Sequence, residues 1–347
     1  MKIGITYNLK DEILPEAILD GESMEEFDSP KTIDALIGVF ERNGYEAVRL
    51  GGGIGIIDKI KSESVDFVFN ISEGYNGRNR ESHIPSMLEA MRIPYSGSDP
   101  LTLGISLDKA VSKAILSQAG IPTPAYRVAV TVDDIRAIEN TLSWPVITKP
   151  AWDGSSKGIY RSSKASNASE LKGNVKFLLD KYPVQPVLVE EYIEGREVTV
   201  GVIGNNPPRI LGLMEIVDKK DPGKDFFYSI EVKRDWKNLV DYISPPELDT
   251  VLDNHIKHYA LAAFKAFGCK DIARMDFRIS KEARPMLLEI NALPGLSPEY
   301  SDIVIMSEKI GIPHDALVMN ILNAALSRYN LPHNTKDIKD GLYHEKI

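Results

Sequence analysis

The chain has 347 residues, of which 43% are hydrophobic and 26% charged, and this length and composition predict a globular protein of two or three compact units. Its formal net charge of −9 argues against the basic face that duplex nucleic acid requires. No apolar stretch is long enough to span a membrane, and the N-terminus lacks the apolar core of a signal peptide. The single cysteine, Cys269, excludes a disulfide framework. We therefore expect a cytoplasmic protein without nucleic-acid or membrane partners.

The first hundred residues show a strand–helix–strand pattern. Ser29 and Pro30 signal the start of a helix, and Gly44 signals its end. The expected elements are strands at Lys2–Tyr7, Tyr45–Leu50 and Val65–Ile71 and a helix at Pro30–Asn43. The third strand is almost continuously apolar, as buried parallel strands are, so a doubly wound α/β unit is predicted. The triple glycine at Gly51–Gly53 lacks the spacing of a dinucleotide-binding motif and is expected to be a plain loop.

The rest of the chain predicts α+β structure with antiparallel strands. Helices are expected at Ser106–Gln118, with Ser106 as its N-cap, and near Asp133–Leu142, Ala168–Asp180, Pro246–Phe267 and Pro313–Tyr329. Strands are expected at Tyr126–Val130, Pro145–Lys149, Val187–Tyr192, Glu197–Ile203, Arg209–Val217, Ile272–Ile279 and Pro285–Ile290, with a polar stretch at Asp218–Asp241. The expected division is a first α/β domain (1–98), a small central domain (99–185), a larger C-terminal domain with an antiparallel sheet (186–330) and a polar tail (331–347).

A lysine and a loop of small residues form the first candidate phosphate site. Lys149 ends an apolar strand, so its ammonium group is expected to leave the edge of the sheet. The loop that follows, Gly154–Gly158, contains Ser155 and Ser156 and offers many backbone N–H donors to phosphate oxygens. A simple turn is the alternative.

Two further lysines lie one helical turn apart near a predicted helix start. Lys109 and Lys113 would lie beside the free N–H groups of that helix start, and those N–H groups attract anions. A solvated, charged helix face is the alternative interpretation of this pair.

A strand with an acidic end provides a candidate nucleotide hinge. Glu190 and Glu191 end an apolar run, and Tyr192 and Ile193 follow before a turn. Such a hinge can offer backbone groups to the edge of an adenine ring and a carboxylate to ribose hydroxyls. A strand with an exposed acidic rim is the alternative.

The strongest pattern is a pair of strands with polar residues at alternate positions. Arg274 and Asp276 share a face of one strand, and Glu289 and Asn291 share a face of the next. Carboxylate and amide oxygens suit Mg²⁺, which also holds substrate phosphates, and Mn²⁺ accepts the same ligands. An arginine beside them can stabilise developing negative charge. The alternative is a structural hairpin with a salt-bridged polar face.

Six segments, in this order and spacing, resemble the ATP-grasp superfamily and, within it, the D-alanine–D-alanine ligases. They are RIPYSGSDPLTLGISLDKAVSK, GIPTPAY, TKPAWDGSSKGI, LVEEYIEGREVTV, GCKDIARMDF and LLEINALPGLS. The resemblance covers about residues 1–330 and implies a three-domain ATP-grasp fold with ATP between the second and third domains. It also implies small amino-acid substrates and a homodimer formed through the first domain.

The resemblance assigns roles to residues that match its motifs. It places Lys109 and Lys149 at the phosphates, Glu190, Tyr192 and Ile193 around adenine, and Glu197 at the ribose. It places two Mg²⁺ ions on Asp276, Glu289 and Asn291, and an oxyanion site at Arg274 and the backbone N–H of Gly295. The stretch Asp225–Tyr242 corresponds to a mobile loop that shuts the site, with Lys233 reaching the phosphates.

The amino-acid pocket departs from the family pattern, which leaves the substrates open. The glutamate that holds the first substrate's amino group has no clear counterpart, so Glu12 or Glu16 is expected to take its place. Glu73 replaces a usual histidine, and Leu296–Ser301, which includes Ser297 and Tyr300, replaces a Thr/Ser-rich run. The chain is thus expected to join two D-alanines or, alternatively, another amino acid or peptide with an extra amino group. A non-catalytic nucleotide-binding module is the remaining alternative.

Overall fold

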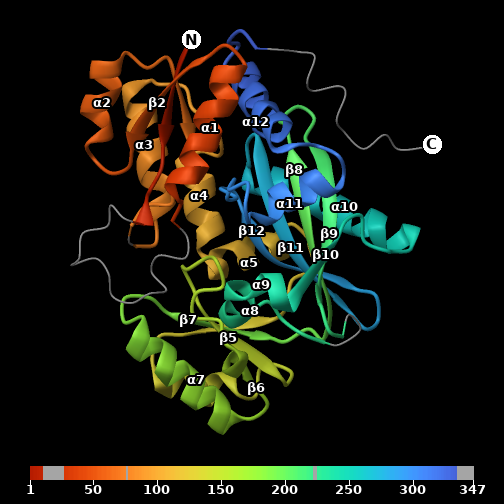
Figure 1. The fold of residues 1–347 in the computed structure, drawn as a ribbon. Coiled ribbons are helices and arrows are strands. Elements are labelled where there is room, and N and C mark those ends of the chain that lie inside the picture. Colours follow the sequence, from red (N-terminus) through yellow and green to blue (C-terminus); the bar gives the residue numbers. More distant parts are fainter. Residues whose placement is uncertain (11–26, 76, 222–224, 334–347) are drawn as a thin grey trace.

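The computed structural model describes residues 1–10, 27–75, 77–221 and 225–333, whose strands form three sheets (Figure 1). The first sheet is parallel and has the order β2 (Glu46–Gly51), β1 (Lys2–Thr6), β3 (Phe67–Asn70). Helix α1 (Pro30–Arg42) covers one face, and α2 (Ile56–Glu63) and α3 (His83–Met91) cover the other. Ser29 caps α1 by accepting a hydrogen bond from the Thr32 N–H, as the sequence predicts. A loop follows β2 at the triple glycine, as expected, and α2, for which the sequence analysis predicted no element, comes directly after it.

The C-terminal helix completes the core of this first sheet. Helix α12 (His314–Arg328) packs against α1, and its Leu317 and Leu322 share one apolar cluster with Phe40 of α1 and Phe69 of β3. The first and last parts of the chain are therefore held together by apolar burial, which is the dominant favourable contribution to folding.

The predicted helix Ser106–Gln118 ends where expected, but its predicted start and N-cap at Ser106 are wrong, because two helices meet at Asp108. These are α4 (Pro100–Leu107) and α5 (Lys109–Gln118). Asp108 has an extended backbone and its carboxylate accepts from the backbone N–H groups of Ala110 and Val111, so it is the N-cap of α5. Ser106 lies inside α4 and donates its hydroxyl to the Leu103 carbonyl. Lys109 thereby becomes the first residue of a new helix.

The second sheet has four strands in antiparallel pairs and lies at the bottom of Figure 1. Its order is β4 (Tyr126–Ala129), β7 (Val187–Glu191), β5 (Val146–Pro150), β6 (Lys164–Ala165). Two helices, α6 (Ile135–Ile138) and α7 (Ala168–Lys181), share one apolar core with these strands. The opposite face is left for contact with the third sheet.

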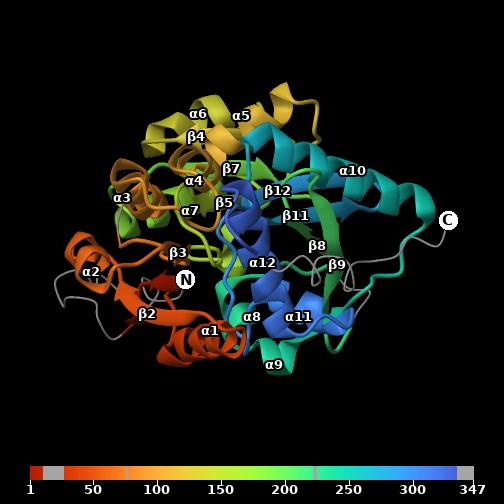
Figure 2. The same ribbon diagram turned by 90° about the horizontal axis from the view of Figure 1, so that it is seen from above.

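The third sheet is antiparallel and is covered on both faces (Figure 2). Its order is β10 (Val240–Ile243), β9 (Arg209–Asp218), β8 (Gly195–Ile203), β11 (Ile272–Ser280), β12 (Pro285–Asn291). Helix α10 (Thr250–Phe267) packs on one face, and α11 (Asp302–Lys309) and α12 pack on the other. Asp249 caps α10 and sets its start four residues after the predicted one.

The stretch predicted as merely polar, Asp218–Asp241, contains regular structure. It forms α8 (Ile230–Arg234) and α9 (Trp236–Leu239) and enters β10, which extends the sheet beside β9. Ile230, Val232 and Val240 are buried, but the many charged residues around them hide their periodicity in the sequence.

The predicted fold class is confirmed, with a doubly wound parallel sheet followed by two α+β units. The domain boundaries at residues 98, 185 and 330 stay a prediction. Within the described ranges, none of the helices combines the length and hydropathy that crossing a bilayer requires.

One buried carboxylate connects distant parts of this fold. Asp271 is 0% exposed and accepts hydrogen bonds from Arg328 of α12 at 2.8 Å, the Gly97 N–H at 2.8 Å and Asn205 at 2.7 Å. Burial lowers the pKa of Arg328, but the Asp271 charge outweighs burial and raises it. The ion pair therefore fastens α12 to the third sheet and to residue 97 of the chain.

We predict that Asp271→Asn destabilises the protein by about 3 kcal/mol, because it leaves a mostly buried arginine without its counter-charge. Asparagine tolerates the positive φ of 65° at this position, so the change isolates the charge. The control is Asp315→Asn, which breaks an exposed pair with Arg42 and should cost less than about 1 kcal/mol. Urea unfolding monitored by circular dichroism measures both values, and equal losses would contradict the prediction.

Candidate active site

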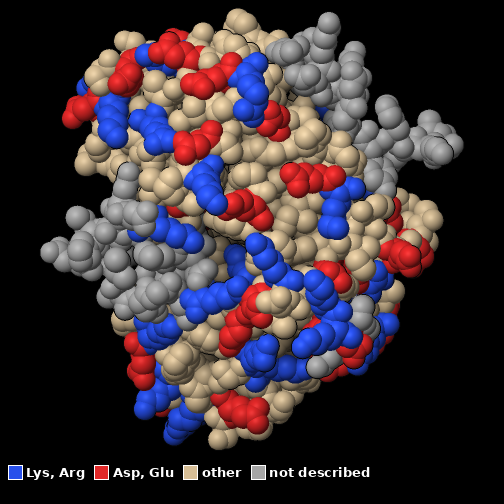
Figure 3. All heavy atoms as spheres, viewed as in Figure 1, with Lys and Arg blue, Asp and Glu red and all other residues tan. Residues whose placement is uncertain are grey.

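Two adjoining cavities lie between the second and third sheets, and they bring most of the predicted site residues together. The first is lined by Lys149, Ser155, Ser156, Glu190, Glu191, Tyr192, Ile193, Glu197, Lys233, Arg274, Asp276 and Glu289. The second is lined by Glu73, Lys109, Asn291 and Gly295, and it shares Ser155, Lys233, Arg274 and Glu289 with the first. Lys149 and Glu289, from different sheets, thus face one cavity. Although the net charge is −9, Lys and Arg side chains gather around the middle of the face of the molecule that Figure 3 shows.

Glu190 of β7 is the carboxylate on which the phosphate-side lysines depend. It is 1% exposed and forms ion pairs with Lys149 of the neighbouring strand β5 and with Lys113 of α5, the latter at 2.7 Å. Lys113 also donates to the Thr123 hydroxyl at 2.9 Å. An exposed acidic rim is therefore wrong for Glu190, and a solvated lysine face is wrong for Lys109 and Lys113, which are buried.

The pKa values follow from this burial and pairing. Burial raises the pKa of Glu190, but the ammonium groups of Lys113 and Lys149 outweigh burial and lower it to about 2. Burial lowers the pKa of Lys113, whereas Glu190 and Glu289 together outweigh burial at Lys149 and raise its pKa. Glu190 therefore stays ionised and keeps Lys149 charged at the cavity.

Lys109 is buried in the wall of the second cavity. Its ammonium group donates to the Asp153 carbonyl and lies 3.7 Å from a Glu289 carboxylate oxygen. Ser155 and Ser156, in the loop after β5, have positive φ values of 53° and 59°. This left-handed backbone turns the loop over the cavities, and the Ser156 hydroxyl donates to the Tyr228 carbonyl of the facing segment.

The predicted hinge lines the first cavity, but its two glutamates differ in exposure and contacts. Glu190 is turned inward, whereas the Glu191 carboxylate accepts from the Ser143 N–H at 2.7 Å at the surface. Glu197 of β8 lies further along the same wall, where burial raises its pKa and Arg278 opposes the increase. Its Oε2 atom is buried and accepts no hydrogen bond from the described residues. An acceptor left open beside a cavity suits the hydroxyl groups of a ribose.

The paired strands β11 and β12 carry the predicted polar row on one face. Asp276 lies opposite Glu289, and Arg274 lies opposite Asn291. Asp276 accepts from Arg274 at 2.9 and 2.8 Å, from Asn291 at 2.9 Å and from Thr199 at 2.6 Å. Burial raises the pKa of Asp276, but Arg274 outweighs burial and lowers it.

These oxygen atoms fit a hard divalent cation that also binds phosphate. Among the described residues, no group of three or more His, Cys, Asp and Glu side chains is arranged to hold a metal ion alone. The set consists of two carboxylates and the amide of Asn291, and Glu289 is the open member at 29% side-chain exposure. Mg²⁺ is commonly held by one or two carboxylates together with substrate phosphates and water, so the set suits it.

Several residues of the site escaped the sequence analysis. Asp302, at the start of α11, lines the first cavity and lies 3.4 Å from the Arg274 guanidinium. Burial raises its pKa, and Arg274 and Lys233 lower it. The hydroxyl groups of Tyr228 and Tyr242 lie 2.9 Å apart beside it. An acidic residue in the first turn of a helix is common, so the sequence carried no signal for Asp302.

The residues that were predicted to bind the amino-acid substrates are only partly brought together. Glu73 lines the second cavity, and the unpredicted Glu81 lines it too. Ser297 is buried in its own turn, where its oxygen accepts from the Glu299 N–H, and Tyr300 is 37% exposed. Within the described part of the chain, neither lies in the lining of these cavities. Glu12 and the alternative Glu16 lie outside the described residues.

The fold of the whole chain is similar to that of a solved ligase. The crystal structure of D-alanine–D-alanine ligase from Bacillus anthracis, complexed with ATP, matches it with a TM-score of 0.71 at 24% identity. The match covers 95% of this chain and 99% of that one. This likeness shows the fold, in which a cleft lies between the second and third sheets.

Sequence comparison gives the family. The family profile described as "D-ala D-ala ligase C-terminus" matches residues 115–323. The D-alanine–D-alanine ligase of Carboxydothermus hydrogenoformans is 35% identical, with 86% of this chain and 89% of that protein covered. An uncharacterized protein of Sinorhizobium fredii is 30% identical, with 85% and 88% covered. The chain belongs to the D-alanine–D-alanine ligase family.

We predict that Glu190 contributes stability that is lost in acid. Because its folded pKa lies near 2, below the ordinary value of 4.5, the contribution is complete above about pH 4.5 and disappears as the pH falls through 2. Its size is on the order of 3 kcal/mol. Glu190→Gln should therefore be less stable at neutral pH and should lack this part of the acid dependence. Glu191→Gln is the matched control, and unfolding at a series of pH values makes the measurement. Parallel profiles for the wild type and Glu190→Gln would exclude the proposed pairing.

Proposed function

We propose that the protein joins two D-alanine molecules in an ATP-dependent reaction that proceeds through an acyl phosphate. One observation carries the proposal: Lys149 and Glu289 line the same cavity, and Arg274 lines both this cavity and the second one. Relatives named D-alanine–D-alanine ligase over most of the chain support the substrate. Dimer formation and a cytoplasmic location stay predictions.

The nucleotide is proposed to occupy the first cavity. Tyr192 and Ile193 would line its adenine, and Glu197 would accept hydrogen bonds from the ribose through the open Oε2 atom. Lys149 is held at the phosphate end by Glu190, and Lys109 approaches from α5. Both ammonium groups are positioned before the ligand binds, so little reorganisation accompanies the reaction.

In the first step, a carboxylate oxygen of the first amino acid attacks the γ-phosphorus, and the bond from that phosphorus to ADP breaks. The charge that spreads over the phosphoryl oxygens would be stabilised by Lys149, Lys109 and Lys233. Asp276, Glu289 and Asn291 would hold Mg²⁺, which neutralises phosphate charge when bound. The loops after β5 and β9 meet through Ser156 and Tyr228 and would exclude water from the acyl phosphate.

In the second step, the amine of the second amino acid attacks the acyl carbon, phosphate leaves and the nitrogen loses a proton. The oxyanion that forms in between would be stabilised by Arg274 and the backbone N–H of Gly295, which both line the second cavity. Asp302 and Asp276 flank the guanidinium of Arg274 and hold it in place.

The lining of the second cavity supports a second candidate, a ligase of the same mechanism with a different amino acid or a peptide. Glu73 and Glu81 both line this cavity, and two carboxylates there favour a substrate with an additional amino group. The first step would be unchanged, because the nucleotide side of the cleft is the same in both cases.

A substrate screen distinguishes the two candidates. We expect ADP and phosphate release with ATP, Mg²⁺ and D-alanine, and mass spectrometry should detect D-alanyl-D-alanine. If ADP and phosphate are released only with a diamino acid or a peptide, the second candidate function is correct and D-alanine is not the substrate. Chelation of the divalent cation should abolish release in either case. Nucleotide binding without turnover on any substrate would overturn the ligase assignment.

We predict that Arg274→Ala lowers turnover by roughly 10²- to 10³-fold, the usual effect of losing one oxyanion donor. Binding of ATP should change much less, because the phosphate-side lysines are untouched. Steady-state kinetics and a fluorescent-nucleotide titration give the two values. A variant within threefold of wild-type turnover would remove Arg274 from the second step.

A further inference from the structure

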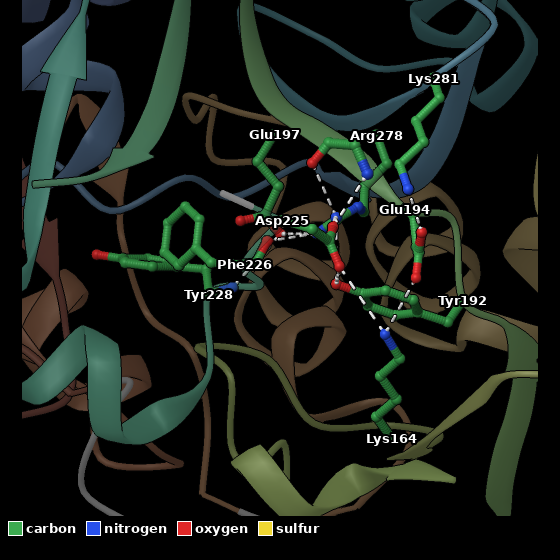
Figure 4. A network of polar contacts seen from close by, with 10 residues as sticks. Lys164, Tyr192, Glu194, Glu197, Asp225, Phe226, Tyr228, Arg278 and Lys281 are labelled. Atoms are coloured by element: carbon green, nitrogen blue, oxygen red, sulfur yellow. Dashed lines mark hydrogen bonds and ion pairs between the residues drawn. The ribbon is translucent and has the colours of Figure 1, made fainter. Parts of the chain in front are cut away.

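Phe227 and Tyr228 line the first cavity. The two residues before them, Asp225 and Phe226, both contact one arginine (Figure 4), and residues 225–228 together are called the rim segment. Arg278 of β11 is 3% exposed. Its guanidinium donates to the Phe226 carbonyl at 2.8 Å, to the Asp225 carboxylate at 2.6 Å and to the Gly195 carbonyl at 2.9 Å. The rim segment is therefore fastened to the third sheet by its backbone and by a charged side chain.

The Asp225 carboxylate joins the rim segment to several other elements. It accepts from the Tyr192 hydroxyl at 2.9 Å and from the Gly195 N–H at 3.0 Å. The ammonium group of Lys164, on the second sheet, lies 3.8 Å away and also lies over the Tyr192 ring. One side chain thus meets the hinge, the start of β8 and the second sheet.

The next residues of the rim segment close the side of the cavity. The rings of Phe227 and Tyr192 pack edge to face with their centroids 5.8 Å apart, and both residues line the cavity. The Tyr228 carbonyl accepts from Ser156, and the Ile230 N–H donates to the Ile159 carbonyl at 2.9 Å. If Asp225 left Arg278, this wall would lose the charged part of its attachment at one end.

Arg278 also contacts the carboxylate that faces the ligand. Its guanidinium lies 3.5 Å from Glu197 Oε1, while Glu197 Oε2 has no hydrogen-bond partner among the described residues. Arg278 is thus shared between a carboxylate of the cavity wall and a carboxylate of the rim segment. A ligand that binds Glu197 restrains this carboxylate beside Arg278. Arg278 in turn restrains Asp225 of the rim segment.

We propose that Asp225 and Arg278 form a latch that holds the rim segment closed over the bound nucleotide, with Arg278 as a positioning residue between Glu197 and Asp225. The proposal rests on the proposed function, because it takes the ligand of the first cavity to be a nucleotide. Closure through the latch slows nucleotide release and keeps water from the phosphoryl group during transfer. Opening requires the Asp225 carboxylate to leave a buried guanidinium, which is a costly step.

The test is Asp225→Asn, which keeps the size of the side chain and removes the charge. Release of a fluorescent N-methylanthraniloyl ATP, measured by stopped flow, should become roughly tenfold faster. The KM for ATP should rise more than kcat falls, and the amount of phosphate released per amide formed should increase. The matched control is Lys281→Ala, which removes an exposed pair with Glu194 in the same network and should leave release unchanged.

A second variant keeps the test independent of the folding of the first. Arg278→Lys retains the charge but replaces the planar guanidinium, whose two terminal nitrogens reach Phe226 and Asp225 separately, by a single ammonium group, so it should also accelerate release. The double variant should release the nucleotide no faster than the more affected single variant, because both changes break one latch. Wild-type release rates in both single variants, or additive effects in the double variant, overturn the latch. Absence of nucleotide binding by the wild type instead overturns the proposed function.

Discussion

The buried carboxylate of Glu190 is the constraint on which the nucleotide side of the site depends. It lies on β7 between Lys149 of the neighbouring strand and Lys113 of α5, and it is almost entirely removed from water. Without this carboxylate two ammonium groups would be desolvated with little compensation, and they would neutralise or leave the interior. With it, Lys149 remains charged at the wall of the cavity, where a phosphate group needs a cation. The ion pairs of Glu190 therefore stabilise the fold and also keep Lys149 charged for binding phosphate.

Two arginines on the other side of the cleft are also held in place by carboxylates. Arg274 is held between Asp276 and Asp302, and Arg278 is held between Asp225 and Glu197. Arg278 is buried and Arg274 is partly buried, and each is paired with two carboxylates that fix the position of its guanidinium. Polyanionic substrates can bind to such an acidic protein because its cations converge on one cleft.

The third sheet, which forms one wall of the cleft, is also held by contacts outside the cleft. Helix α12 contributes to the core of the first sheet and, through Arg328 and Asp271, to the end of β11. The strand that carries Arg274 and Asp276 is therefore connected to the first unit of the fold by burial and by an ion pair. This link explains how residues from the first hundred positions, such as Glu73, come to line the second cavity.

Local patterns, together with the family resemblance, predicted the fold class, the strands that carry the polar row and most of the residues that line the two cavities. Alternation along β11 and β12 placed Arg274, Asp276 and Glu289 correctly, because side-chain direction in a strand follows from the backbone alone. The break at Asp108 was missed because either Ser106 or Asp108 can cap a helix, and packing selected the second.

Only the tertiary structure decided the partners of charged residues. Asp302 meets Arg274, and Asp225 meets Arg278, across gaps of 28 and 53 positions in the chain, and nothing local distinguishes these carboxylates from solvated ones. Desolvation is a property of the folded interior, so the burial of Glu190 and Lys113 arises only when α5 packs against β4 of the second sheet and β12 of the third.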